Sequence, residues 1–215
     1  MIPDWFAERH AMVQKQLRRR GIRDPRVLSA MARIPREEFI PTESRLLAYS
    51  DDPIPIGWGQ TISQPYMTAL MAEALELCGS ETVLEVGAGC GYAAAVLGAL
   101  AARVVAVEIV PALAARAQAN LRRTGLDGNI EIRAGDGAAE SSEGTTFEAV
   151  SVAAAAPEIP LPLLARLRDP GRLVMPVGSP GDQELRVVTK LDGRIDYRVA
   201  TLCRFVPLRG AEGFR

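Results

Sequence analysis

The chain has 215 residues, of which 48% are hydrophobic and 24% are charged, and this balance supports a folded core and excludes an intrinsically disordered protein. Its 25 basic and 26 acidic residues give a formal net charge of −1, whereas a general nucleic-acid binder carries a basic excess, so we expect no nucleic-acid partner. No apolar run approaches the ~20 residues of a membrane-spanning helix, so we expect a soluble chain without a membrane partner, of a length that fits a single domain.

Cysteine and histidine content narrows the chemistry further. The three cysteines, Cys78, Cys90 and Cys203, are too few and too scattered for a disulfide framework or a zinc site. A Ser-His-Asp triad would have to use the single histidine, His10, which lies on an apolar stripe and is expected to pack or to face solvent. Charged residues interrupt the first apolar stretch, which disfavours a secretion signal. We expect a cytoplasmic protein with no metal site.

Residues 1–62 are expected to form an N-terminal extension of short helices and extended turns. Asp24 precedes Pro25 in the way that a helix cap precedes a proline in the first turn. Prolines at positions 35, 41, 53 and 55 are expected to break regular structure as far as Gly59. The basic run at 18–20 is interpreted as a solvated helix face, with nucleic-acid contact as the alternative.

Residues 63–177 alternate between helical and strand patterns. Apolar residues at helical spacing predict helices, and short apolar or alternating runs predict strands. The expected helices are 65–77, 91–101, 111–123 and 161–167, and the expected strands are 82–86, 103–107, 129–133, 147–153 and 172–176. Strands that alternate with helices form a parallel sheet covered on both faces, so we predict a doubly wound α/β fold with residues 63–215 as its Rossmann-like core.

The last part of the chain has a different pattern. Two runs rich in β-forming residues, 184–190 and 195–206, flank Asp192-Gly193, a dipeptide that favours a hairpin turn. The mostly parallel sheet is therefore expected to end in antiparallel strands.

The first expected core strand runs into a glycine-rich turn, Val86-Gly87-Ala88-Gly89-Cys90-Gly91-Tyr92. Glycines in such a turn let a ligand approach the backbone closely. The spacing is G-x-G-x-G, whereas a dinucleotide fingerprint needs G-x-G-x-x-G, whose last glycine would fall on Tyr92. The carboxylate of Glu85 beside the turn disfavours a phosphate and favours an amino-bearing ligand. The motif therefore disfavours a nicotinamide dehydrogenase.

Two more acidic residues follow the next two expected strands. Glu108 lies 21 residues after Gly87 and can accept hydrogen bonds from both hydroxyls of a ribose. Asp136, in the run Ala134-Gly135-Asp136-Gly137, can accept one from the amino group of an adenine. The carboxyl ends of neighbouring parallel strands share one edge of the sheet, so we expect Glu85, Glu108 and Asp136 to line one crevice. The combination indicates S-adenosylmethionine as the ligand, with S-adenosylhomocysteine as its product.

A further segment, Pro55-Ile56-Gly57-Trp58-Gly59-Gln60-Thr61-Ile62-Ser63-Gln64-Pro65-Tyr66, is more specific than the glycine turn. Together with several other runs, it resembles the protein-L-isoaspartate O-methyltransferase family. These runs are 85–92, 135–137, Ala154-Ala155-Ala156-Pro157-Glu158-Ile159-Pro160, 170–178 and Arg204-Phe205-Val206-Pro207-Leu208. The resemblance extends from about Met12 to Leu208.

The resemblance implies a monomeric repair enzyme built as one methyltransferase domain. Such an enzyme transfers a methyl group from S-adenosylmethionine to the free α-carboxylate of an L-isoaspartyl residue in a damaged protein, and the ester then collapses to a succinimide. The family's active-site serine falls on Ser63. Its cofactor-binding positions fall on Glu85, Gly87, Ala88, Gly89, Glu108, Ile109, Asp136 and Gly137. Its substrate-binding positions fall on Ile56, Gly57, Gln60, Thr61, Ser63, Val206 and Leu208.

Ser63 is interpreted as a residue that orients the attacking carboxylate, and not as a nucleophile. A carboxyl group with a reference pKa of about 4 is already ionised at neutral pH, and the sulfonium is already activated, so the reaction needs neither histidine nor metal. The protein has to align oxygen, methyl carbon and sulfur. A helix cap ahead of Pro65 is the structural alternative for Ser63.

Some residues of the fourth core strand depart from the family pattern. Ser151 stands where an aliphatic residue is usual, and Ala153 stands where a threonine or glycine is usual. The loss of a hydroxyl at position 153 would remove a hydrogen bond worth roughly 1 kcal/mol. Two alternatives stay open: a carboxyl methyltransferase dedicated to one peptide, and an inactive relative that keeps the adenosyl pocket.

Overall fold

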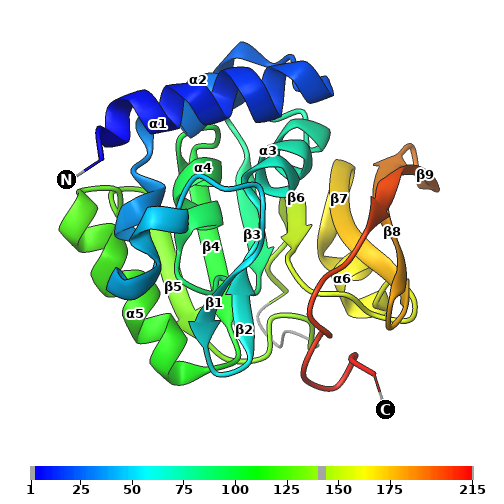
Figure 1. Ribbon diagram of the computed structural model, residues 1–215. Coiled ribbons are helices and arrows are strands. Elements are labelled where there is room, and N and C mark those ends of the chain that lie inside the picture. Colours follow the sequence, from blue (N-terminus) through cyan, green and yellow to red (C-terminus); the bar gives the residue numbers. More distant parts are fainter. Residues whose placement is uncertain (1–2, 140–143, 215) are drawn as a thin grey trace.

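The computed structural model describes residues 3–139 and 144–214, which fold around a central sheet (Figure 1). The helices are α1 (Trp5–Met12), α2 (Pro25–Arg33), α3 (Pro65–Ala74), α4 (Tyr92–Gly98), α5 (Pro111–Thr124) and α6 (Leu161–Arg166), with short π and 3₁₀ turns η1 (Val13–Leu17), η2 (Arg18–Arg20), η3 (Arg36–Glu38) and η4 (Thr42–Leu47). The strands are β1 (Ile54–Gly57), β2 (Gln60–Ile62), β3 (Thr82–Val86), β4 (Arg103–Glu108), β5 (Ile130–Ala134), β6 (Phe147–Val152), β7 (Leu167–Ser179), β8 (Asp182–Leu191) and β9 (Arg194–Cys203). Within these described residues, no helix has the length and hydropathy to cross a membrane.

The central seven-stranded sheet has the order β5-β4-β3-β6-β7-β8-β9. Neighbouring strands are parallel from β5 to β7, and β8 and β9 complete the sheet as antiparallel strands. The predicted mostly parallel sheet with an antiparallel end is confirmed. Its last turn lies at Asp192 and Gly193, whose φ angles of 52° and 75° are those of a type I′ hairpin turn. The strand order reverses at β3, and this is where open α/β sheets bind ligands.

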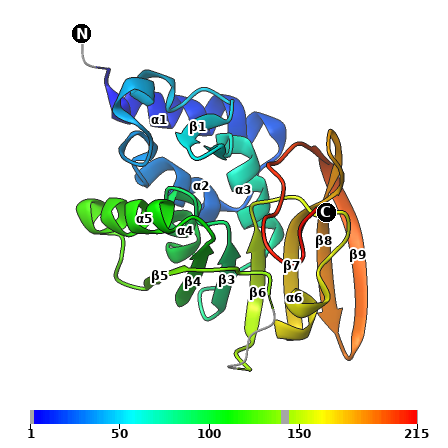
Figure 2. The ribbon, with the colours of Figure 1, turned by 90° about the horizontal axis from the view of Figure 1, so that it is seen from below.

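Alternate residues of the strands point into two separate hydrophobic layers. One layer contains Val83 and Val104 together with Leu17 and Ile56 of the N-terminal extension. The other layer contains Leu84 and is covered by α6. Helices α1 to α5 gather on one side of the sheet (Figure 2). The N-terminal extension therefore shares a core with the sheet instead of standing apart from it.

Two stretches are more regular than the sequence suggests. The proline-containing segment before Gly59 forms the β1–β2 hairpin, because each strand of a two-stranded ribbon is an edge strand and tolerates the missing N–H of Pro55. Gly57, Trp58 and Gly59 turn the chain with φ angles of 94°, 53° and 71°. Strand β7 extends well beyond the predicted 172–176, because it pairs with β8 along the whole stretch from Gly171 to Ser179.

Arg36 is a fully buried charge that connects the N-terminal extension to the segment that carries Ser63. Its guanidinium donates hydrogen bonds to the backbone oxygens of Ala48 and Ser63, each over 2.8 Å. The same group lies over the ring of Tyr92, 4.9 Å from the ring centroid. Burial disfavours the charged guanidinium and lowers the pKa of Arg36. The two hydrogen bonds and the ring contact offset part of this cost of desolvation.

We expect Arg36→Ala to lower the free energy of unfolding by about 3 kcal/mol, because the carbonyl oxygens of Ala48 and Ser63 lose their donor and a cavity opens. Arg33→Ala, which removes an exposed arginine at the end of α2, is the matched control and should cost less than about 0.5 kcal/mol. Urea unfolding followed by circular dichroism measures both. Equal unfolding free energies for the two variants would contradict the structural role of Arg36.

Candidate functional site

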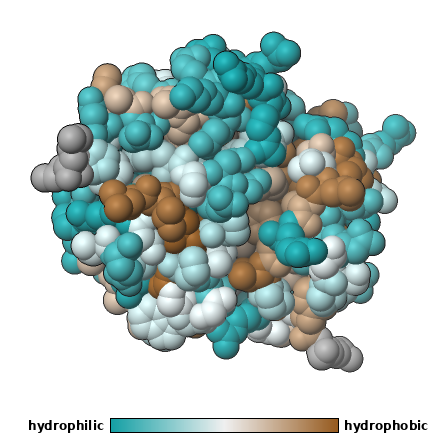
Figure 3. Space-filling view, viewed as in Figure 1, coloured by the Kyte–Doolittle hydropathy of each residue, from teal (hydrophilic) through white to brown (hydrophobic). Residues whose placement is uncertain are grey.

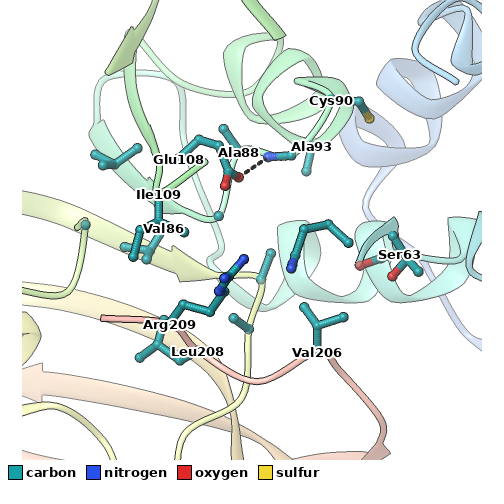
Figure 4. A pocket seen from close by; sticks show the side chains of 18 of the residues that line it. Ser63, Val86, Ala88, Cys90, Ala93, Glu108, Ile109, Val206, Leu208 and Arg209 are labelled. Carbon is teal, nitrogen blue, oxygen red and sulfur yellow. Dashed lines mark hydrogen bonds between the residues drawn. The ribbon is translucent and has the colours of Figure 1, made fainter. Parts of the chain in front are cut away.

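The main pocket lies at the carboxyl ends of β3, β4 and β6 (Figure 4). Its lining combines the β2 region, the glycine turn, the end of β4 and the C-terminal segment. The predicted site residues that line it are Gln60, Thr61, Ser63, Gly87, Ala88, Gly89, Glu108, Ile109, Gly137, Val206 and Leu208. Segments that are far apart in the sequence therefore meet in one pocket.

The glycine turn brings backbone to the pocket wall. Gly87, Gly89 and Gly91 have φ angles of 90°, 55° and 90°, in the left-handed region that side chains disfavour. Gly91 ends the turn as the N-cap residue of α4. A Cβ on Gly89 would stand 3.3 Å from Cδ1 of Ile56, so the glycine turn packs against Ile56 of β1 as well as lining the pocket.

Glu108, the last residue of β4, is the carboxylate that faces the main pocket. It is only 4% exposed, and it accepts hydrogen bonds from the backbone N–H groups of Gly89 (2.8 Å) and Val110 (3.0 Å). A carboxylate offers about four acceptor positions, so two of them remain for a ligand. Glu108 can therefore fix the glycine turn and bind a pair of ribose hydroxyls at the same time.

The other two predicted carboxylates do not line this pocket. The side chain of Glu85 points to the opposite side of the β3 terminus from Val86 and lines a smaller cavity behind it. Asp136 accepts hydrogen bonds from the backbone N–H groups of Ala138 (3.0 Å) and Ala211 (2.9 Å), and so attaches the C-terminal segment to the turn after β5. The side chains of Glu85 and Asp136 thus lie outside the lining of the main pocket, although Gly135 and Gly137 on either side of Asp136 belong to it, and a shared crevice for all three carboxylates stays a prediction.

Two of the predicted substrate residues also lie outside the pocket lining. Ile56 is fully buried beneath the glycine turn, and its backbone oxygen accepts a hydrogen bond of 2.8 Å from Arg116. Gly57 lies at the tip of the β1–β2 hairpin. Ile56 therefore supports the glycine turn from the core, and Gly57 lines a different surface pocket.

Ser63 lies where three cavities meet. Its backbone oxygen is fixed by Arg36, while its hydroxyl makes no hydrogen bond to the described residues. The N-cap residue of α3 is Gln64, which makes no side-chain capping bond, so the structural alternative of a cap at Ser63 is wrong. The Ser63 hydroxyl is therefore available to a ligand.

A wider groove runs from Ser63 toward β9. Its volume is about 650 Å³, and its walls include Tyr66, Leu202 and Phe205. Leu202 is 72% exposed, and the surface on the β9 side is apolar in the space-filling view (Figure 3). The groove and the main pocket share Thr61, Ser63, Ala153 and Val206, so the two are adjacent.

Sequence reasoning missed Arg209, which follows directly after the family-like run 204–208. Its exposed side chain points into the main pocket (Figure 4). It makes no hydrogen bond or ion pair with the described part of the chain, so it can move aside for a ligand. Only its position next to that run could have indicated a site residue.

The fold and the pocket together define a class of protein. A mostly parallel sheet, a glycine turn after its first core strand and a buried acidic residue at the end of the next strand are features of a Rossmann-like fold, whose ligand crevice lies where the strand order reverses. The protein is an S-adenosylmethionine-dependent methyltransferase with a Rossmann-like fold.

The chain belongs to the family of protein-L-isoaspartate(D-aspartate) O-methyltransferases, whose profile matches residues 7–213. It is 51% identical over 209 residues to protein-L-isoaspartate O-methyltransferase 2 of Marinobacter nauticus, a match that covers 96% of this chain and 94% of that protein. It is 52% identical over 195 residues to protein-L-isoaspartate O-methyltransferase 1 of Anaeromyxobacter sp., covering 90% of this chain and 92% of the relative.

Solved structures agree with this assignment. A Plasmodium falciparum protein assigned as a protein-L-isoaspartate O-methyltransferase, crystallised with S-adenosyl-L-homocysteine, superposes with a TM-score of 0.79 at 28% identity over 94% of this chain and 98% of its own. A second protein-L-isoaspartate O-methyltransferase superposes with a TM-score of 0.81 at 27% identity over 95% of this chain and 66% of its own. The fold similarity thus extends over nearly all of this chain.

Proposed function

We propose that this chain methylates the free α-carboxylate of L-isoaspartyl residues in damaged cytoplasmic proteins and thereby starts their repair through a succinimide. Its family membership and relatives of about half identical sequence support the activity and the cofactor. The observation that carries the proposal is the position of Ser63. Its free hydroxyl stands between the adenosyl pocket and the open groove, where a peptide carboxylate meets a methyl donor.

The lining of the main pocket supports S-adenosylmethionine as the ligand. Glu108 offers two acceptor positions to the ribose, and the apolar side chains of Ile109 and Leu208 suit an adenine ring. A Cβ on Gly137 would stand 3.0 Å from Cβ of Val107, so glycine allows the chain to pack closely against Val107 at this wall. S-Adenosylmethionine supplies an activated methyl group when bound. The proposed cofactor-binding residues are Gly87, Ala88, Gly89, Glu108, Ile109 and Gly137.

The acceptor side needs orientation and no base. A substrate carboxylate is ionised at neutral pH, so it is already the nucleophile. Ser63 donates a hydrogen bond to one carboxylate oxygen and leaves the other oxygen aligned for attack. Gln60 and Thr61 from one side and Val206 from the other enclose the reacting carboxylate and limit its access to water.

We further propose that the enzyme acts as a monomer of a single domain, as its resemblance to the family implies. The proposal requires neither a nucleic-acid nor a membrane partner. Its substrate is a peptide segment that fits the groove beside Ser63.

A panel of isoaspartyl peptides with unrelated flanking sequences tests the proposal. A general repair enzyme should methylate all of them with kcat/KM values within about two orders of magnitude of each other, because binding relies on the isoaspartyl group more than on any flanking side chain. Activity on a single peptide would favour a dedicated carboxyl methyltransferase. Binding of S-adenosylhomocysteine without methyl transfer to any peptide would indicate an inactive relative.

A further inference from the structure

A small cavity lies behind Ser63, between the sheet and helices α3 and α4. Its volume of about 20 Å³ is room for one water molecule. The polar residues of its lining are Ser63, Thr68, Glu85 and Ser151, and the remaining lining is apolar. Ser63 and Thr68 also line the main pocket, so the cavity stands directly behind the wall of the proposed site.

Glu85 is the feature of this cavity that calls for an explanation. It is 1% exposed, and neither of its carboxyl oxygens has a hydrogen-bond partner within the described residues. A buried polar group without a partner costs about 1–3 kcal/mol, and such groups in folded proteins are usually satisfied by ordered water. The carboxyl group and the cavity beside it therefore indicate a bound water molecule.

Strand register places a second polar group next to Glu85. On the parallel neighbour β6, Ser151 is the register partner of Glu85, so both side chains point to the same face of the sheet. On the other side, the register partner on β4 is Ala106, which is too small to fill the space. The Ser151 hydroxyl and the Glu85 carboxyl thus stand side by side at the cavity wall.

The surroundings of Glu85 favour its neutral form. Among the described residues, its titratable neighbours are Glu108 from β4 and Cys90 from the glycine turn, and neither supplies a positive charge. Helices α3 and α4 present apolar side chains and the Thr68 hydroxyl, and β6 presents Ser151. Burial, together with the charge of Glu108, raises the pKa of Glu85 to about 8. A neutral carboxyl group can donate a hydrogen bond, whereas an ionised one can only accept.

We propose that the cavity holds one water molecule that links Glu85 and Ser151 to the Ser63 hydroxyl, which makes Glu85 and Ser151 positioning residues for methyl transfer. The inference rests on the proposed function. The neutral carboxyl group of Glu85 donates a hydrogen bond to the water, and the water donates one to the hydroxyl oxygen of Ser63. The Ser63 hydroxyl then donates its own hydrogen bond to the substrate carboxylate. When Glu85 loses its proton, the water oxygen can accept a hydrogen bond from the Ser63 hydroxyl. The water then competes with the substrate carboxylate for that hydrogen bond.

Three variants test this linkage. Glu85→Gln keeps a neutral donor of the same shape, Ser151→Ala removes one hydroxyl, and Glu43→Gln makes the same chemical change at an exposed carboxylate. Steady-state kinetics on an isoaspartyl peptide between pH 6.5 and 9 report on the peptide site. Calorimetric binding of S-adenosylhomocysteine reports separately on the cofactor site. A high-resolution crystal structure gives a readout that is independent of activity.

We expect the peptide KM of the wild type and of Glu43→Gln to rise about tenfold or less as the pH passes about 8, since Glu85 loses its proton there. In Glu85→Gln, this rise in KM is absent. Ser151→Ala should lower kcat/KM about five- to tenfold, which is the effect of one lost hydrogen bond, with the affinity for S-adenosylhomocysteine within twofold of the wild type. The crystal structure should show a water within hydrogen-bond distance of Glu85, Ser151 and Ser63.

Other results overturn the inference. If Glu85→Gln weakens the binding of S-adenosylhomocysteine as strongly as a substitution of Glu108 does, Glu85 binds the cofactor and does not position Ser63. A KM that still rises with pH in Glu85→Gln, or a cavity without water in the crystal structure, also contradicts the linkage. If the wild-type protein methylates no isoaspartyl peptide, the proposed function is contradicted. The crystal structure then tests by itself whether the cavity holds the water molecule.

Discussion

Glu108→Ala should weaken the binding of S-adenosylhomocysteine by at least tenfold. Glu108 is buried at the wall of the main pocket and has two acceptor positions left for ribose hydroxyls. Hydrogen bonds to a charged group are worth about 1.5–3 kcal/mol, which corresponds to about a tenfold to hundredfold change in the dissociation constant. Isothermal titration calorimetry with the purified protein measures this change directly.

Glu108 also holds the glycine turn through Gly89, so a second variant separates binding from folding. Glu108→Gln keeps the size of the side chain and should weaken binding less than Glu108→Ala, because its amide oxygen still accepts a hydrogen bond. Glu43→Ala is the control at an exposed glutamate and should leave the affinity unchanged. Wild-type affinity in a folded Glu108→Ala protein would show that the cofactor binds elsewhere.

Ser63→Ala should lower kcat/KM on isoaspartyl peptides by about tenfold or more, while the affinity for S-adenosylhomocysteine stays within twofold. The expected loss is that of one hydrogen bond to a charged carboxylate, about 1.5–3 kcal/mol, which is made to the acceptor and not to the cofactor. Steady-state kinetics and calorimetry on the same protein separate the two effects.

The control for Ser63→Ala is Ser29→Ala, which removes an exposed hydroxyl on α2, outside the lining of the pocket. This change should leave both kcat and affinity at wild-type values. An unchanged kcat/KM in Ser63→Ala would contradict the orienting role. Equal losses in turnover and in cofactor affinity would instead place Ser63 in the cofactor site.

Local patterns were sufficient to predict the central part of the fold. The alternation of strand and helix patterns predicts the parallel strands β3 to β7, and Asp192-Gly193 predicts the final hairpin, because both depend on short stretches of sequence. The β1–β2 hairpin was missed since its prolines suggest irregular structure unless both strands are known to be edge strands. The length of β7 depends on pairing with β8, which is a tertiary effect.

The candidate site was predicted only in part for the same reason. A buried parallel strand is apolar on both faces, so the sequence does not reveal to which side Glu85 points. The contacts of Asp136 with Ala211 and the approach of Arg209 to the pocket depend on the path of the C-terminal segment across the sheet. By contrast, Glu108 and the glycine turn follow from the strand-turn-helix pattern alone, and they lie where that pattern predicts.

Methyl transfer to a matched pair of peptides tests the proposed function most directly. The two peptides share one sequence and differ only in an L-isoaspartyl or an ordinary aspartyl linkage, and the methyl group of S-adenosylmethionine carries the label. The proposal predicts base-labile label on the isoaspartyl peptide alone. Label on both peptides or on neither, in a protein that binds S-adenosylhomocysteine, would contradict a repair methyltransferase.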